Sequence, residues 1–275
     1  MAERVWLITG CSAGFGRHLA LAALAAGDRV VATARRTEQL TDIVDAGGER
    51  VRTARLDVTE AATIDAAVTT ALSAFGRIDV IVNNAGHGSV GSVEELTMTD
   101  LRALMDVMFF SAVAVTKAVL PHLRRQRAGT IVQMSSMGGQ LTMPGFGAYC
   151  AAKFALEGLS EALAAEVAPF GVRVLIVEPG AFRTEFGGHR MHRSQTIDAY
   201  EVSTAQTRAA VDQMDGTQPG DPAKAAQAIL RVIDDADPPL RLALGNDAVD
   251  NIRTHHEQLR TDLDRWEKLS RSTDL

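Results

Sequence analysis

The stretch Val5-Trp-Leu-Ile-Thr-Gly-Cys-Ser-Ala-Gly-Phe-Gly16 decides the expected fold, because an apolar run passes directly into a glycine-rich turn. Residues 5–9 are apolar on both faces, which is typical of a strand in a parallel sheet covered by helices. A helix is predicted to follow at residues 14–26, closed by Gly27, since glycine just past a helix is a common stop signal. The chain therefore begins as an alternating α/β protein.

The same alternation of short β-branched runs and longer helical stretches continues along most of the chain. It predicts an α/β fold with a doubly wound, Rossmann-type and mostly parallel sheet of about seven strands in a single domain. The predicted strands are residues 5–9, 30–34, 51–56, 80–82, 131–134, 172–177 and 240–243, and the predicted helices are residues 14–26, 37–46, 61–75, 101–126, 148–168 and 222–235.

The composition fits one globular unit. The 275 residues are 46% hydrophobic without linker or repeat, so a body at residues 1–245 and a helical tail at residues 246–275 are predicted. The net charge, 28 − 34 = −6, has both signs interspersed and argues against nucleic-acid binding. Residues 5–8 are too short for a signal peptide, and no apolar segment is expected to approach the ~20 residues that span a bilayer. A soluble, cytoplasmic protein is expected.

Metal binding is not expected. Cys11 and Cys150 are the only cysteines, and the seven histidines have no carboxylate or thiolate partners at ligand spacing. Both cysteines are interpreted as small buried apolar side chains.

Short motifs follow four of the predicted strands, at the edge where parallel sheets bind ligands. A glycine loop between a strand and a helix lets the main chain approach a pyrophosphate, with the helix N-terminus facing the anion. Taken alone, that loop fits a plain tight turn equally well. Together, the motifs are expected to converge on one crevice. They are Gly10, Gly14 and Gly16, then Asn83-Asn-Ala-Gly86, then Ser136, and finally Pro179-Gly180.

Tyr149 and Lys153 stand one helical turn apart, so their side chains share one face of the predicted helix at residues 148–168. An unperturbed tyrosine titrates near ~10, and a nearby ammonium stabilises the phenolate, so Lys153 is expected to lower the pKa of Tyr149. A half-buried tyrosine beside a solvated lysine is the plainer alternative for the pair alone. The accompanying motifs favour a general acid and base.

In this combination and order, from about residue 4 to about residue 245, the motifs resemble those of the short-chain dehydrogenase/reductase superfamily. The resemblance implies hydride transfer between a nicotinamide cofactor and the carbonyl or alcohol carbon of a small molecule. Tyr149 would exchange the proton, Lys153 would assist it and hold the nicotinamide ribose, and Ser136 would hydrogen-bond the substrate oxygen. Ser135 lies one residue too far from Tyr149 and is interpreted as loop structure.

The resemblance also implies a set of cofactor contacts in the body, residues 1–245. Asp57 would contact adenine, Asn83 and Ala85 would line the adenosine ribose, and Thr184 would hold the nicotinamide amide. The full expected set is Gly10, Ser12, Phe15, Gly16, Arg35, Asp57, Val58, Asn83, Ala85, Gly86, Tyr149, Lys153, Pro179, Gly180 and Thr184.

The choice between NAD(H) and NADP(H) depends on the end of the second strand, where an acidic side chain would bind the ribose diol and repel a 2′-phosphate. That place holds Ala34, followed by Arg35 and Arg36. Arginine suits a phosphate because its planar fork donates several hydrogen bonds. NADP(H) is therefore predicted to be preferred, with NAD(H) as the alternative, although Ala13 stands where similar reductases often carry a second basic residue.

Met108 departs from the family pattern. Similar enzymes usually carry an asparagine there, which completes a proton relay through water to the lysine. We expect the main-chain carbonyl of Met108 to accept that water, since every helical residue offers a carbonyl. Two alternatives stay open: a catalytically weak NADP(H)-binding sensor or scaffold, and a sugar-nucleotide epimerase or dehydratase, which usually has a larger C-terminal substrate domain.

The expected substrate-facing residues are apolar and favour a small hydrophobic ketone or alcohol. They are Met137, Met143, Phe146, Phe182 and Phe186. Residues 183–214 are rich in charge and lack clear periodicity. They are predicted to form either a substrate lid or a plain surface excursion.

The tail carries an apolar stripe at steps of three and four residues, as in an amphipathic helix. It is expected to dock on its own body, with a subunit contact as the alternative, because so few heptads do not define a coiled coil. A homodimer or homotetramer is expected. The stripe consists of Val249, Ile252, His256, Leu259, Leu263 and Trp266.

Overall fold

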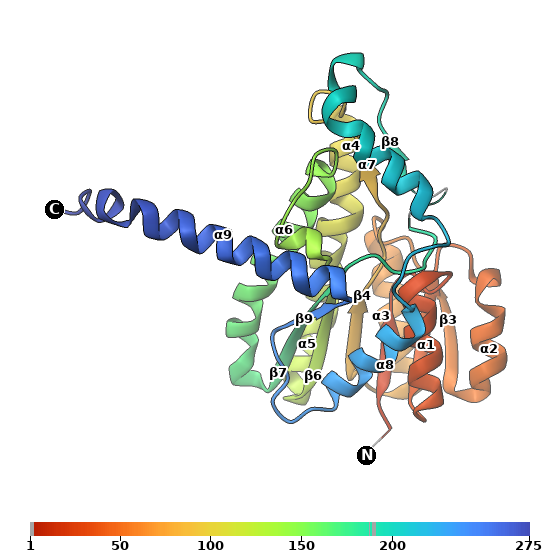
Figure 1. Cartoon of the computed structure of the whole chain (residues 1–275). Helices are drawn as coiled ribbons and strands as arrows, with labels where there is room; N and C mark the ends of the chain where they lie inside the picture. Colours follow the sequence, from red (N-terminus) through yellow and green to blue (C-terminus); the bar gives the residue numbers. More distant parts are fainter. Residues whose placement is uncertain (1–2, 187, 189–190) are drawn as a thin grey trace.

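A fully parallel sheet of seven strands forms the centre of the molecule, in the order β3-β2-β1-β4-β6-β7-β9 (Figure 1). The computed structural model describes residues 3–186, 188 and 191–275. The strand order reverses at β1, which pairs with β2 on one side and with β4 on the other. The predicted doubly wound sheet is confirmed. Its strands are β1 (Val5–Ile8), β2 (Arg29–Ala34), β3 (Val51–Arg55), β4 (Val80–Asn83), β6 (Gly129–Met134), β7 (Val172–Pro179) and β9 (Arg241–Leu244).

Helices cover both faces of the sheet, as strands that are apolar on both sides require. The helices on one face are α1 (Gly14–Ala25), α2 (Thr41–Gly47) and α8 (Pro222–Ile233), and those on the other are α3 (Ala61–Phe75), α5 (Ser111–Gln126) and α6 (Gly147–Val167). Short 3-10 turns lie at Thr37–Leu40, Gly48–Arg50, Met137–Gly139, Ala168–Phe170 and Asp198–Tyr200.

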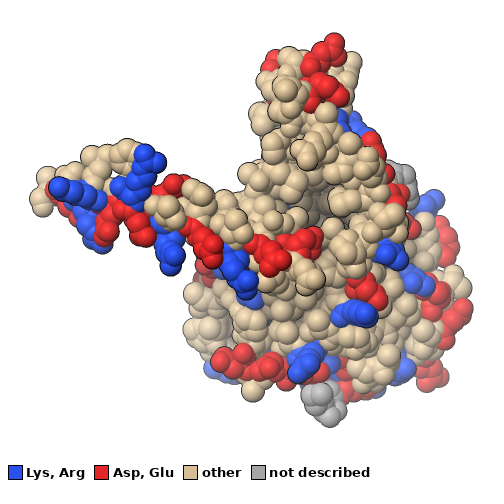
Figure 2. Space-filling model, in the orientation of Figure 1, with Lys and Arg blue, Asp and Glu red and all other residues tan. Residues whose placement is uncertain are grey.

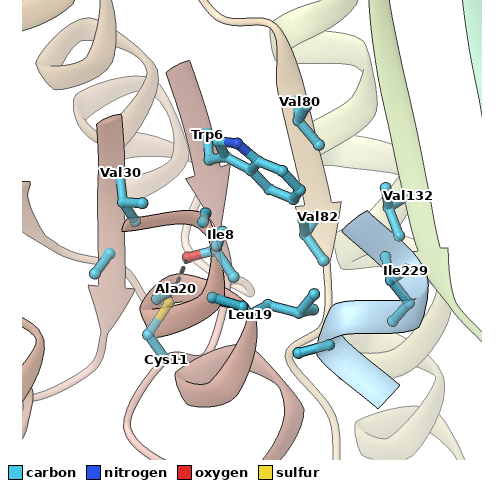
Figure 3. Close-up of a cluster of buried hydrophobic side chains, with 14 of the residues drawn as sticks. Trp6, Ile8, Cys11, Leu19, Ala20, Val30, Val80, Val82, Val132 and Ile229 are labelled. Carbon is cyan, nitrogen blue, oxygen red and sulfur yellow. Dashed lines mark hydrogen bonds between the residues drawn. The ribbon is translucent and has the colours of Figure 1, made fainter. Parts of the chain in front are cut away.

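Alternate residues of β1 supply the two cores, because successive side chains of a strand point to opposite faces. Trp6 and Ile8 pack in the core under α1 and α8, whereas Leu7 packs in the core under α3 and α5. Figure 3 shows the first core, in which Leu19 of α1 and Ile229 of α8 lie against the strands. Full burial of such a side chain contributes about 1.5 to 3 kcal/mol, so these layers hold the carboxyl ends of the strands firmly in place.

The helix predicted at residues 101–126 is one helical run whose winding changes in the middle. α4 (Met98–Met105) passes into a π-helical turn at Asp106–Phe110 and then into α5, and the Ser111 amide donates to the Asp106 carbonyl five residues back. Residues 98–126 are long and apolar enough to cross a membrane by length and composition, so the expectation that no segment approaches that length was wrong. Val115 and Val119 nevertheless pack in the core, which makes this a core helix of the domain.

Part of the segment at residues 183–214 forms structure that the sequence did not predict. β5 (Ser89–Val90) pairs in parallel with β8 (His192–Arg193), and α7 (Glu201–Met214) follows. Residues 187, 189 and 190 of this segment lie outside the described part of the chain. Figure 1 shows α7 and β8 beside α4, in the upper part of the view.

The tail is helical, as predicted, but only its first half docks on its own body, where Ala248 is buried and His256 bonds to Gln140. α9 (Asn246–Arg271) begins directly after β9, leaves the domain and ends far from it (Figure 1). Every residue from position 256 to position 275 is exposed. The stripe has the right period for packing, but no part of the domain that the structure describes lies along the outer half of the helix.

Candidate active site

The glycine loop after β1 brings two stretches of main chain into contact. Gly10 and Gly14 have φ angles of +72° and +53°, a region that favours glycine. A Cβ on Gly16 would lie 2.4 Å from the Gly10 carbonyl oxygen, so the start of α1 fits against the loop only without a side chain. This cradle suits a pyrophosphate at the N-terminus of α1.

Asn84 ties the glycine loop to the turn after β4. Its side-chain amide donates to the carbonyls of Thr9 at 2.8 Å and Gly10 at 3.1 Å, and its main-chain amide donates to the Thr9 hydroxyl at 2.8 Å. The sequence did not single it out, although it lies beside Asn83 in the same motif.

Asn83 was expected at the adenosine ribose, and this expectation is wrong for its side chain. Asn83 is the last residue of β4, and its side chain lies on the α5 face of the sheet. Its side-chain nitrogen donates to the Thr116 hydroxyl at 3.0 Å and to the Gln133 side-chain oxygen Oε1 at 2.9 Å. Asn83 is therefore buried scaffold, and Asn84 lines the cleft instead.

A cleft of about 1240 Å³ lies at the carboxyl ends of the strands and brings the motifs together. Every residue of the expected cofactor set lines it except Gly16 and Asn83. Ser136, Met108 and all five expected substrate-facing residues line it as well. Lining residues that the sequence did not single out include Gln39, Asn84, Met191, Val211 and Met214.

The end of the cleft beside β2 and β3 is basic. Arg35 and Arg36 follow Ala34 there, next to Asp57. Among the described residues, no carboxylate forms an ion pair with Arg35, so its guanidinium is free to meet a ligand. Hydrogen bonds from Thr59 hold the pKa of the Asp57 carboxyl below its usual range, and the charge of Arg35 adds to the effect.

Ser136, Tyr149 and Lys153 share one wall of the cleft. The Lys153 ammonium donates to the Met134 carbonyl at 2.7 Å and lies 5.8 Å from the centre of the Tyr149 ring. The Ser136 hydroxyl oxygen accepts a bond from the Gly138 amide at 3.0 Å, which fixes the side chain. The serine caps the 3-10 turn that follows β6, and helix α6 supplies the other two.

The protonation of the pair differs from the sequence-based expectation. Burial raises the pKa of Tyr149 above its usual value, and hydrogen bonding with Ser136 opposes the rise. The effect of burial is the larger, so the net lowering of the Tyr149 pKa that was expected beside Lys153 is not seen in this structure. The lysine is itself buried, which lowers the pKa of Lys153 to about 8, while the charge of Glu157 opposes that shift. Burial therefore favours the protonated phenol.

A buried acidic cluster lies one turn further along α6 than the lysine. Glu157 accepts hydrogen bonds from the Ser135 hydroxyl at 2.6 Å and from the Gln140 amide, which also donates to Glu178 at 3.0 Å. Arg241 of β9 forms ion pairs of 3.3 Å with both carboxylates. Burial raises the pKa of Glu178, and the neighbouring Glu157 raises it further. Ser135 therefore acts as loop structure, in agreement with the prediction.

Met108 anchors the turn after β4. Its Sδ accepts a hydrogen bond from the His87 amide at 3.3 Å, and a Cβ on Gly86 would lie 3.0 Å from the same sulfur. Met108 is buried within the π-helical turn. The helix is therefore loosened at this position even though a methionine side chain cannot compete for main-chain partners.

The substrate end of the cleft is apolar and is closed by the segment at residues 183–214. Phe146 and Phe186 pack on the Tyr149 ring, with centroids 6.0 Å and 5.3 Å away. Glu95 anchors the segment to the rest of the domain. Its carboxylate accepts a hydrogen bond from the Ile197 amide at 2.8 Å and forms an ion pair with Arg208 of α7 at 2.6 Å. These long-range contacts make the segment a built wall of the cleft.

Fold and site together define an oxidoreductase that uses a nicotinamide cofactor on CH–OH or C=O groups of a small molecule. The chain belongs to the short-chain dehydrogenase family, whose model, described as short chain dehydrogenase, matches residues 4–195.

Relatives cover nearly the whole chain. Oxidoreductase BOA17 of Botryotinia fuckeliana is 40% identical over 268 residues, which are 97% of this chain and 98% of that protein. The 3-ketodihydrosphingosine reductase of Bacteroides thetaiotaomicron is 36% identical over 246 residues, 89% of each chain.

Solved structures agree with the fold and the cofactor class. A short-chain dehydrogenase from Streptomyces avermitilis is 50% identical, covers 100% of both chains and has a TM-score of 0.95. An alcohol dehydrogenase from Thermococcus sibiricus in complex with 5-hydroxy-NADP is 25% identical, covers 88% of this chain and 96% of its own, and has a TM-score of 0.73. A 3-ketoacyl-(acyl-carrier-protein) reductase from Brucella melitensis in complex with NADH has the same identity, coverage and TM-score.

Proposed function

We propose that this chain uses NADPH to reduce hydrophobic ketones or aldehydes, or NADP⁺ to oxidise the matching alcohols. One observation carries the proposal. A single cleft holds Ser136, Tyr149 and Lys153 between a basic end at Arg35 and an end lined by methionine and phenylalanine. The 3-ketodihydrosphingosine reductase among the relatives is named for a lipid ketone, which supports a substrate of this class.

The residues present fit a nicotinamide dinucleotide. The cradle of Gly10 and Gly14 would take the pyrophosphate, and Asp57 would face the adenine. Arg35 would bind the 2′-phosphate, because its guanidinium has no ion-pair partner among the described residues and no acid stands at the end of β2. Lys153 and Thr184 would hold the nicotinamide end.

The chain's own residues set up the proton transfer. Bound nicotinamide supplies or accepts the hydride. Ser136 and Tyr149 together hydrogen-bond the substrate oxygen, and Tyr149 donates its proton in reduction and takes one in oxidation. Phe146 and Phe186 pack around the ring and exclude water from it.

Lys153 stabilises the charge that develops on Tyr149 when the proton leaves. With a pKa of about 8, the lysine is mostly charged at neutral pH and can also release a proton. The main-chain carbonyl of Met108 accepts the water through which the proton returns, and the π-helical turn provides the loosening that this requires.

Cofactor titration combined with a carbonyl panel tests the proposal. Wild type should bind NADPH more tightly than NADH, and Arg35→Ala should lose NADPH affinity by about 10- to 150-fold, the value of one charge-assisted hydrogen bond. Arg55→Ala is the matched control, because Arg55 lies on the neighbouring strand and already pairs with Glu60. A wild-type preference for NADH, or an unchanged preference in Arg35→Ala, would contradict the assignment.

A catalytically weak NADP(H) sensor is the second candidate, and Met108 is the observation that favours it. Tight NADPH binding without turnover on any hydrophobic ketone, aldehyde or alcohol would support the sensor. A cytoplasmic location and a homodimer or homotetramer complete the proposal, and each is open to direct measurement.

A further inference from the structure

The outer half of α9 exposes a row of large apolar side chains. We call the six residues Val249, Ile252, His256, Leu259, Leu263 and Trp266 the tail stripe. Leu259 is 53% exposed, Leu263 is 66% exposed and Trp266 is 54% exposed. At 1.5 Å per residue, the 26 residues of α9 extend about 39 Å. Figure 2 shows charged side chains of both signs along the projecting helix.

Such a row is a feature of interfaces. Helices gain most of their stability from packing an apolar face, and large exposed apolar patches on a folded chain mark contact surfaces. The steps of the tail stripe, alternately three and four residues, are those of the seam between two paired helices. The missing contact is therefore expected to be another helix.

The inner half of the tail stripe borders a hollow of about 420 Å³ between α9 and the edge strand β9. Val249, Ile252 and His256 line this hollow, whereas Leu259, Leu263 and Trp266 belong to the outer half beyond it. The hollow is mainly apolar with charged residues at its rim. Its complete lining is Ala243, Val249, Ile252, Arg253, His256, Glu257 and Arg260.

We propose that two copies of this chain pair their α9 helices in antiparallel fashion, so that the outer half of each tail stripe fills the hollow of the other copy. A twofold axis between positions 257 and 258 places Trp266 against Val249, Leu263 against Ile252 and Leu259 against His256 of the second copy. Each apolar outer residue then has a partner on an inner position, and both hollows are filled by the same operation.

A parallel pair fits less well. It would place both domains at the same end of the helices, where β9 already borders the stripe. It would also bring Asp262 of one helix beside Glu267 of the other, since these flanking positions face each other in a parallel pair. The antiparallel pair places the two domains at opposite ends. The two halves of the stripe match each other, which favours a second copy over an unrelated protein.

Pairing would also stabilise, in each copy, the loop from Ser136 to Gln140 that follows β6. His256 of the tail stripe bonds through Nε2 to the Gln140 side-chain oxygen at 3.0 Å, just after the loop that begins at Ser136. Near the start of α9, Asp247 accepts from the Ala181 amide at 2.7 Å. The seam therefore begins where the helix is bonded to two loops that border the cleft.

Light scattering of the purified full chain after size-exclusion chromatography tests the pairing. Wild type at tens of micromolar should show at least twice the chain mass, and the double variant Leu263→Asp/Trp266→Asp should show half the wild-type mass with an unchanged melting temperature. Val202→Asp is the control, because Val202 is 94% exposed on α7 and outside the stripe, so this variant should keep the wild-type mass. A monomeric wild type, or a double variant with the wild-type mass, would overturn the proposal.

Cross-linking tests the direction. Copies carrying Val249→Cys mixed with copies carrying Trp266→Cys should form a disulfide-linked dimer under mild oxidation, whereas Leu263→Cys alone should not link to itself. The native Cys11 and Cys150 are buried and do not interfere. Linking of Leu263→Cys without linking of the mixed pair would show a parallel arrangement and contradict the proposed one.

Discussion

The two halves of the cleft are built in different ways. The nucleotide half consists of turns that leave the strands directly, and the main chain shapes it, as at Gly10 and Gly14. The substrate half consists of segments distant in sequence, held together by contacts such as Glu95 with Arg208 and the pairing of β5 with β8. Local sequence can therefore specify the first half, whereas the second depends on where the completed fold brings distant side chains.

The largest effect is expected at Tyr149, where the two halves meet. Tyr149→Phe removes the proposed proton donor and should lower kcat by about 10²- to 10⁴-fold, the usual contribution of general acid–base catalysis. NADPH affinity should survive, because the phenol acts on the substrate oxygen. Lys153→Ala should lower both kcat and NADPH affinity, since the ammonium is proposed to assist the tyrosine and to bind the ribose. Steady-state kinetics with cofactor titration separates the two variants, and near-normal turnover in Tyr149→Phe would end the general-acid assignment.

A smaller effect, confined to the nucleotide half, is expected at Gly16. A Cβ there would meet the Gly10 carbonyl at 2.4 Å and the Asn84 side-chain nitrogen at 2.5 Å, so Gly16→Ala forces the loop apart. We expect a loss of about 1 to 3 kcal/mol in the free energy of unfolding and at least a tenfold loss of NADPH affinity, about 1.4 kcal/mol. Urea unfolding and nucleotide titration measure the two effects.

Gly158→Ala is the control for this variant. It also adds a Cβ to a helical glycine, but nothing lies within 4 Å of that Cβ. It should stabilise the chain by up to about 1 kcal/mol, the difference in helix propensity between alanine and glycine. Equal changes in stability and NADPH affinity in the two variants would show that the close approach of Gly16 to Gly10 is not required.

The smallest effect is expected at Met108. The π-helical turn is already present with methionine, so Met108→Asn should change kcat by less than about tenfold, or 1.4 kcal/mol of barrier. The comparison requires wild type and variant on the same carbonyl panel with NADPH. An inactive wild type beside an active Met108→Asn variant would instead support the nucleotide sensor.

Much of the fold and the nucleotide half could be predicted, because both follow from local patterns. The apolar runs locate all seven strands of the sheet within about two residues, and the motif order predicts the cleft that the strands form. The one wrong side chain in that half, Asn83, differs from the right one by a single position. A strand alternates its faces at every residue, so the end of β4 decides which asparagine reaches the cleft.

The remainder depended on tertiary context. α7 and the two-residue strands β5 and β8 have too little periodicity to be recognised, and only the completed fold pairs them. The spacing of the tail stripe predicted the helix correctly, but an amphipathic pattern does not indicate what covers the apolar face. The spacing of Tyr149 and Lys153 predicts a shared face but not its burial, and burial controls both pKa values. The same helical spacing places Glu157, one turn beyond the lysine, on the same face of the helix, so its position near Lys153 could have been predicted.

The two tryptophans lie in different environments, so their intrinsic fluorescence reports on two different parts of the protein. Trp6 is fully buried in the first core, where its indole donates to Asp28 at 2.7 Å, whereas Trp266 is 54% exposed near the end of α9. The emission of Trp6 should report only on unfolding of the domain, and that of Trp266 on whatever covers the tail. Dilution of the native protein should therefore shift the fluorescence of one indole to longer wavelength and leave the other unchanged.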